Sequence, residues 1–203
     1  MPASLRATLL PSLFSLSRVE TILNEVAELP PRLQRIAGEI LLLRIANVLE
    51  NGFSDIFRKL ICGAPYLDGS SATIFVTAKS MSDAYNLILN YNRKSQIRHI
   101  NWLLIKSIKE GCKHIIVESE HCIAVMDRYY AELDAIRVIR NHIAHSNSGT
   151  RKEYSDLLTS YYGPRAHTIP CGTMLMSRTL HGREMIRLYL IAARAVLRDL
   201  TKA

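Results

Sequence analysis

The residues whose types and spacing can support chemistry stand in the segment VIRNHIAHSNSGT, residues 138–150, an apolar run that ends in a polar turn. Arg140, Asn141, His142 and His145 lie close together there. A guanidinium can bind two phosphate oxygens and an imidazole can give or take a proton, so Arg140 with His145 suits phosphate chemistry. A metal ligand must be neutral, and the neighbouring guanidinium disfavours a metal. The segment therefore predicts a phosphate-directed site without a metal.

The spacing of these residues predicts that they share one face near the C-terminal end of a helix over residues 123–145. At about 100° per residue, four polar residues lie within about 60° of Asp134 and form a polar stripe. Its members are Asp134, Arg137, Asn141 and His145. Isoleucines on the opposite side are expected to face the core. Arg140 lies off the edge of the stripe, about 100° from Asn141.

Two other interpretations of these residues stay open. Arg and His side chains near a helix C-terminus also cap its exposed carbonyl groups, which requires no function. Arg137 with His142 repeats the same spacing in a second register, which ranks lower because Val138 rather than a polar residue follows Arg137. His142 itself is expected about 60° from His145 and outside the stripe.

The elements that position this segment are expected to be almost entirely helical. Pro30 and Pro31 separate a first amphipathic segment, residues 16–29, from a long helix over residues 32–61. The long helix carries apolar residues at spacings of three and four and ends at Gly63. Further helices are expected from residue 82, over residues 96–111 and over residues 178–200, with a polar loop over residues 146–176. A turn-rich connector over residues 65–80 is either a short strand or a loop.

Together these elements predict a single all-α domain, residues 1–203, built as an up-and-down helical bundle with a short irregular or β insert around residues 65–80. Residues 1–31 form an N-terminal extension or first helix, and residues 32–203 form the core of the bundle. No apolar run approaches the roughly 18–20 residues of a membrane span, and no secretory signal is expected. We therefore expect a cytoplasmic chain without a membrane partner.

The charge balance favours an anionic partner. Lys and Arg number 26 against 18 Asp and Glu, a net charge of +8, which favours nucleic acid ahead of an anionic membrane surface. Four arginines are expected on one face of the last helix: Arg183, Arg187, Arg194 and Arg198. This face is either a solvated helix surface, the more ordinary interpretation, or a row that follows a phosphate backbone. The stretch NRKSQIRHINW, residues 92–102, is a second basic segment of the same kind.

The cysteines indicate neither a metal site nor a disulfide framework. No two of them form a CxxC pair, which is typical of reduced, mostly buried thiols. They are Cys62, Cys112, Cys122 and Cys171. His114 and His121 lie near two of these cysteines, but the spacing fits no common zinc finger, so no metal and no cofactor are expected.

The segment RNHIAH, residues 140–145, resembles the signature of the HEPN superfamily, the higher eukaryotes and prokaryotes nucleotide-binding helical domains. That signature is an Arg, often followed by a polar residue such as Asn, and then a His after four to six intervening residues. The helix GEILLLRIANVLENGFSDIFRKLI resembles the first core helix of several HEPN families, where an acidic residue stands between apolar residues and an aromatic one. Glu50, with Phe53 after it, matches that position. The resemblance covers roughly residues 32–200 and assigns no subfamily.

The resemblance implies an all-α homodimer that is a metal-independent endoribonuclease, as in toxin–antitoxin, CRISPR-associated and antiviral defence systems. Two copies of the motif then meet at the dimer interface and form one site. His145 handles a proton, Arg140 binds the phosphate, and Asn141 orients His145 or a phosphate oxygen. The expected supporting residues are Glu50, Asp134 and Arg137.

Other members of the superfamily lack catalysis, so two further functions stay open. One is a non-catalytic RNA-binding or protein-assembly module that uses the same polar stripe. The other is an antitoxin-like or complex subunit whose apolar faces bind another protein. The expected partners are RNA, a second copy of the chain, and a cognate antitoxin or defence-system protein.

Overall fold

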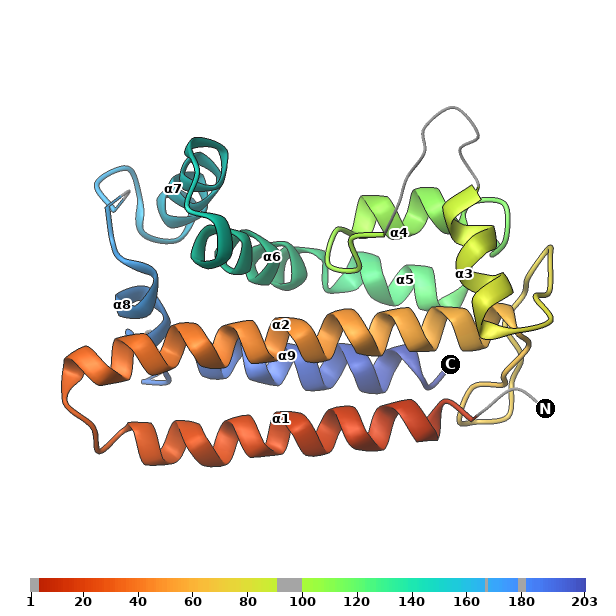
Figure 1. Cartoon of the computed structure of the whole chain (residues 1–203), viewed down its shortest axis with the longest axis horizontal. Helices are drawn as coiled ribbons and strands as arrows, with labels where there is room; N and C mark the ends of the chain where they lie inside the picture. Colours follow the sequence, from red (N-terminus) through yellow and green to blue (C-terminus); the bar gives the residue numbers. More distant parts are fainter. Residues whose placement is uncertain (1–3, 91–99, 167, 179–181) are drawn as a thin grey trace.

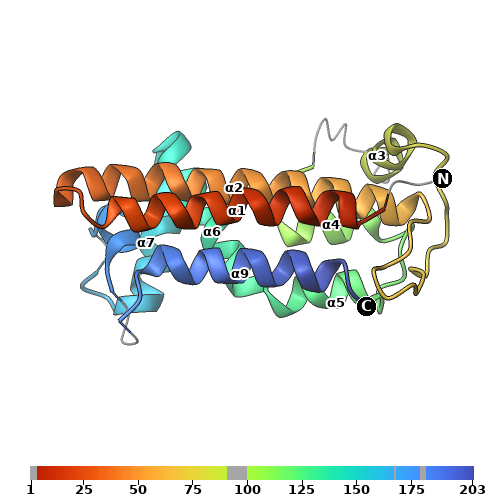
Figure 2. The same ribbon diagram turned by 90° about the horizontal axis from the view of Figure 1, so that it is seen from below.

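Three helices run side by side along the molecule, with their facing sides buried (Figures 1 and 2). They are α1 (Arg6–Val26), α2 (Pro31–Ile61) and α9 (Met185–Leu200). The computed structural model describes residues 4–90, 100–166, 168–178 and 182–203, and within them the chain is an all-α helical bundle, as predicted. No helix in these ranges is long and apolar enough to cross a membrane.

The sequence of α2 explains its length and its buried face. Pro31 takes the first helical position, where a missing N–H group breaks no hydrogen bond. The predicted apolar residues are all buried: Leu42, Ile45, Ala46, Leu49, Phe53, Ile56, Phe57 and Leu60. Burial of each large side chain among them contributes about 1.5–3 kcal/mol. The helix ends because Gly63 adopts a left-handed conformation with φ 81°. The predicted helix over residues 32–61 is therefore confirmed.

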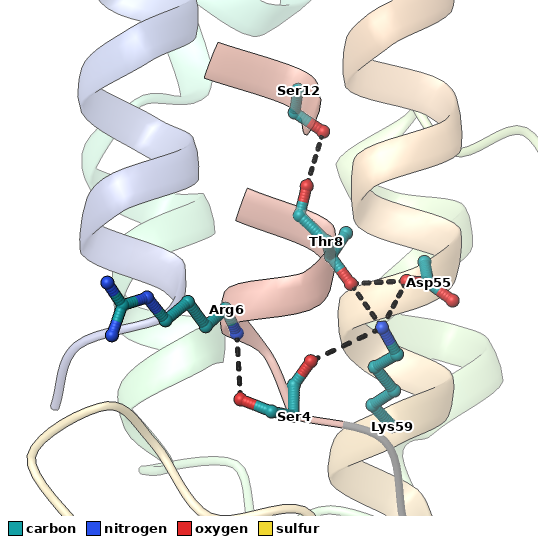
Figure 3. Close-up of polar contacts among 6 residues, drawn as sticks. All are labelled: Ser4, Arg6, Thr8, Ser12, Asp55 and Lys59. Carbon is teal, nitrogen blue, oxygen red and sulfur yellow. Dashed lines mark hydrogen bonds and ion pairs between the residues drawn. The ribbon is translucent and has the colours of Figure 1, made fainter. Parts of the chain in front are cut away.

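α1 begins earlier than predicted, at Arg6 rather than near residue 16, although Pro11 lies inside it. Pro11 stands in the second turn, where it removes a single backbone hydrogen bond. A buried lysine then ties this end of α1 to α2 (Figure 3). Lys59 is 6% exposed, and its ammonium lies 2.7 Å from Asp55 Oδ2 and donates to Thr8 Oγ1 at 2.6 Å. The hydroxyl of Thr8 also donates to Asp55, so the buried polar groups satisfy one another.

The remaining helices lie on the side of α2 and α9 away from α1 (Figures 1 and 2). They are α3 (Met81–Asn90), α4 (Ile105–Cys112), α5 (His121–Arg128), α6 (Tyr130–His145), α7 (Ser148–Tyr162) and α8 (Cys171–Met176). The connector over residues 62–80 has no helix, and its only described β pairing is an isolated bridge between Ile74 and Ile116. It is therefore the irregular insert expected there.

The region around the motif contains more helix boundaries than predicted. Tyr129, with φ −98° and ψ 17°, divides the predicted helix over residues 123–145 into α5 and α6. The polar loop expected over residues 146–176 was wrong, because this stretch contains α7 and α8. Asn147 caps α7 by accepting the N–H of Thr150 at 3.0 Å. The SNSG turn therefore ends one helix and starts the next.

Two helices begin later than predicted. α9 begins at Met185 rather than at residue 178, so Arg183 precedes the helix. α4 begins at Ile105, and residues 100–104 are not helical. Residues 96–99 of that predicted helix lie outside the described ranges, as does most of the basic stretch over residues 92–102.

α8 approaches α2 closely at Gly172. A Cβ atom at Gly172 would overlap the backbone carbonyl oxygen of Arg35, so the approach requires a residue without a side chain. The N–H of Gly172 donates to Glu39 Oε1 at 2.9 Å, which fixes the two helices in this register. This contact places α8 beside α2 at the end of the molecule where α6 gives way to α7 (Figure 1).

Candidate functional site

The candidate residues lie on the last turns of α6, where this helix passes over α2 (Figure 1). α6 ends because Ser146 adopts a left-handed backbone with φ 39°, and its N–H donates to the carbonyl oxygen of His142 at 3.1 Å. α7 begins directly afterwards. The polar side chains of α6 therefore stand at a corner formed by α2, α6 and α7.

Arg140 is held by two groups. Its Nη2 lies 3.6 Å from Glu50 Oε1 on α2, and its Nη1 donates to Asn141 Oδ1 at 3.1 Å. The side chains of Arg140 and Glu50 are 29% and 26% exposed, so the pair is accessible to a ligand. Of the expected supporting residues, Glu50 therefore lies beside Arg140.

His145, the last residue of α6, is exposed and has no hydrogen bond or ion pair to any residue that the structure describes. It stands five residues after Arg140. On an α-helix this spacing corresponds to a rotation of about 140° and a rise of about 7.5 Å. Asn141 lies between them in angle. Within one chain, Arg140 and His145 therefore leave α6 in directions about 140° apart and are not in contact.

Asp134 and Arg137 serve the packing of α6 rather than the candidate site. Arg137 Nε donates to Asp134 Oδ1 at 2.8 Å, and Arg137 Nη1 donates to Glu153 Oε2 on α7 at 3.1 Å. Burial lowers the pKa of Arg137, but these two carboxylates outweigh burial and raise it above its usual value. The side chain of Arg137 is 15% exposed, and Asp134 is engaged with it rather than with Arg140.

His142 is a packing residue between α6 and α7. Its ring stacks on the ring of Tyr154, with centroids 4.5 Å apart and an interplanar angle of 13°. Its Nδ1 is buried and accepts or donates no hydrogen bond within the described ranges. Burial lowers the pKa of His142. This position agrees with the expectation that His142 lies outside the polar stripe.

The row of four arginines on α9 is not formed as predicted. Arg183 precedes the helix, and two of the others join α9 to α1. Arg187 donates to Glu184 at 2.6 Å and to Asn24 at 2.9 Å. Arg194 donates to Glu20 Oε2 at 2.7 Å. Arg198 and Arg183 are exposed, and a role for these arginines in RNA binding stays a prediction.

The cysteines lie mostly in the core, and His121 contacts the backbone of α9. Cys112, Cys122 and Cys171 are buried and Cys62 is partly buried, and all four are free thiols. Burial raises the pKa of Cys122 to about 12 and also raises that of Cys112, which keeps both thiols neutral. His121 Nε2 lies 2.7 Å from the carbonyl oxygen of Asp199. Across the described ranges, no group of three or more His, Cys, Asp or Glu side chains is arranged to hold a metal ion.

Sequence analysis missed Glu153, which binds Arg137, and Tyr154, which stacks on His142, because both stand in a stretch expected to be a loop.

Comparison of the chain with protein-family models, with curated proteins and with solved structures finds no match.

Proposed function

We propose that this chain is a metal-independent endoribonuclease of the HEPN type, which acts as a homodimer in a toxin–antitoxin or antiviral defence setting. One observation carries the proposal. The guanidinium of Arg140 is restrained by Glu50 and Asn141, and the imidazole of His145 is exposed at the end of the same helix. Arginine suits a phosphate group and histidine suits proton transfer, so the pair has the groups that RNA cleavage requires.

The proposed reaction needs a base, an acid and a cation. The ribose 2′-oxygen attacks the adjacent phosphorus while its proton passes to a neutral His145 imidazole. The bond from phosphorus to the 5′-oxygen breaks, and that oxygen takes a proton from a protonated imidazole, the partner's His145. Arg140 stabilises the negative charge that develops on the phosphorane oxygens. The products are a 2′,3′-cyclic phosphate and a 5′-hydroxyl.

A second chain is part of the proposal because Arg140 and His145 do not touch within one chain. Two-fold symmetry would place a second imidazole and a second guanidinium at the same site. The outer face of α2 supplies an apolar surface next to it. Leu33, Ile36 and Ile40 are 47%, 49% and 60% exposed. Ile36, Leu43 and Glu50 follow one another at intervals of seven residues. This surface therefore continues along one face of α2 to Glu50, the residue paired with Arg140.

The test is cleavage of a mixed-sequence RNA in the presence of EDTA. We expect wild-type protein to cleave it, and we expect Arg140→Ala and His145→Ala to lower the rate by about 100-fold or more. Arg151→Ala, which removes an exposed arginine from α7, is the matched control and keeps wild-type activity. DNA of the same sequence stays intact because it lacks the attacking hydroxyl. Intact RNA after prolonged incubation with the wild-type dimer would refute the proposal.

The second candidate is a non-catalytic RNA-binding module. The separation of Arg140 from His145 within the chain favours it, because phosphate binding by Arg140 needs no nearby imidazole. RNA binding that weakens with salt, survives His145→Ala and produces no cleavage is the outcome that would select this function.

A further inference from the structure

An apolar groove of about 490 Å³ lies between α9, the start of α6 and the end of α7. Its lining includes Tyr129, Glu132, Tyr161, Leu188, Ala192 and Ala195. Glu132 and His145 are thirteen residues apart on α6, or about 20 Å along the helix axis, so the groove is separate from the candidate nuclease site. Its volume falls within the roughly 300–1,000 Å³ of small-molecule sites.

Three tyrosines of the lining are held in place by their hydroxyl groups. The hydroxyl of Tyr129 donates to Asp199 Oδ2 at 2.8 Å, and the hydroxyl of Tyr189 donates to that of Tyr161 at 3.3 Å. All three rings are therefore fixed by neighbours, and they contribute to the lining of the groove. The small side chains of Ala192 and Ala195 leave room on α9 between these rings.

Glu132 is the charged residue of the lining, and it has no ion-pair partner in the described part of the chain. Four other glutamates are paired with arginine, namely Glu20, Glu50, Glu153 and Glu184, whereas Glu132 is exposed on the first turn of α6. The carboxylate of Glu132 lies close enough to both tyrosines to add to the effect of burial, which raises the pKa of Tyr129 and of Tyr161. In a chain of net charge +8, this groove therefore combines aromatic rings with an exposed carboxylate, while Arg128 beside Tyr129 is paired with Asp199.

We propose that the groove binds a lipophilic organic cation, a small molecule whose apolar body lies on Ala192 and Ala195 and whose positive charge lies beside Glu132, Tyr129 and Tyr161. Aromatic rings attract a cation through their negative faces, and the neighbouring carboxylate of Glu132, although exposed, adds a Coulombic attraction. RNA does not fit this lining, because an anionic backbone would meet Glu132 and no lysine or arginine. The inference is independent of the proposed nuclease function.

The test uses two ions of nearly equal shape and opposite charge, tetraphenylphosphonium and tetraphenylborate, titrated by calorimetry into the full-length protein. The net charge of the chain favours the borate, so a preference for the phosphonium has to come from a local site. We expect one saturable phosphonium site per chain, with at least roughly tenfold weaker binding of the borate. Glu132→Gln is expected to weaken phosphonium binding roughly five- to tenfold, and Ala192→Trp is expected to abolish it by filling the groove.

Glu28→Gln is the matched control, because it removes an exposed carboxylate from the turn between α1 and α2 and leaves the groove intact. Its phosphonium affinity is expected to equal that of the wild type. The absence of a saturable phosphonium site, equal binding of both ions, or binding that is unchanged in both Glu132→Gln and Ala192→Trp would overturn the inference. Unchanged circular dichroism of each variant shows that the fold is retained.

Discussion

At the scale of single residues, Arg140 is restrained from two directions, by Glu50 on α2 and by Asn141 beside it on α6. Arginine carries five N–H donors, so both contacts leave donors for a phosphate group. A guanidinium that is already oriented needs little rearrangement when charge develops on the phosphorane. Glu50 is therefore a positioning residue in the proposed reaction.

Glu50→Gln tests this role because it keeps the size of the side chain and removes its charge. We expect kcat for RNA cleavage to fall about tenfold, because Arg140 is less well oriented. KM is expected to be unchanged or lower, because a negative charge near the bound phosphate is lost. The free energy of unfolding is expected to change by less than about 1 kcal/mol, because the pair is partly exposed. Asp134→Asn, which acts on Arg137, should leave kcat unchanged. An unaltered kcat in Glu50→Gln would remove Glu50 from the account.

His142 makes a pH-dependent contribution to stability. Burial holds its pKa in the folded protein below the value of about 6.5 in the unfolded chain. The unfolded chain therefore binds a proton more readily, and the free energy of unfolding falls as pH drops below about 6.5. Glu39 and Arg151 are the charged groups that act on this ring, with opposite effects.

The measurement is urea unfolding at about pH 7.5 and about pH 5.5 for the wild type and for His142→Phe. Phenylalanine retains a ring against Tyr154 and does not titrate. We expect a smaller loss of stability on acidification in the variant than in the wild type. Equal losses in the two proteins would show that His142 does not titrate in this range.

Residue-level prediction worked where the relevant contact follows from helix geometry or from the motif. Ile136 and Ile139, opposite the polar stripe, are buried as expected. The pairing of Arg137 with Glu153 was missed because its partner lies on α7, in a stretch too polar to indicate a helix. A side chain's partner on another element depends on tertiary packing, which residue spacing alone does not contain.

At the scale of elements, Gly172 sets how closely α8 can approach α2. Gly172→Ala is expected to lower the free energy of unfolding by about 1–3 kcal/mol, because its Cβ would overlap the carbonyl oxygen of Arg35. Gly149→Ala on α7 is the matched control. Its Cβ would lie 3.4 Å from Asn147 Oδ1, an ordinary contact distance, and alanine has a higher helix propensity than glycine. Thermal unfolding of both variants checks the prediction. A Gly172→Ala protein as stable as the Gly149→Ala protein would contradict the close approach.

Helix boundaries were predictable where the sequence itself contains the stop signal. α2 starts at Pro31 and ends before Gly63, and its apolar spacing is unbroken between them. No proline or glycine marks the break at Tyr129. The hydroxyl of Tyr129 donates to Asp199 on α9, a helix that is distant in the sequence. α7 has few buried side chains, so its sequence lacks the apolar spacing that identifies a helix.

At the scale of the whole molecule, the account requires two chains that meet through the outer face of α2. Ile40→Glu places a charge at the centre of the exposed apolar row and is expected to convert the dimer into a monomer and abolish RNA cleavage. Phe14→Glu is the matched control, because Phe14 is 66% exposed on α1 and lies outside that row. Sedimentation velocity measures the oligomeric state. A dimer that persists in Ile40→Glu would place the interface elsewhere.

The central claim is that the residues at the end of α6 cleave RNA by attack of its own 2′-hydroxyl, and the chemistry of the new ends tests it most directly. Mass spectrometry of fragments from a defined RNA, incubated with the wild-type dimer in EDTA, is predicted to show 2′,3′-cyclic phosphate and 5′-hydroxyl ends that are absent with His145→Ala. Fragments with 5′-phosphate ends, the same fragments from His145→Ala, or no fragments at all would contradict the account.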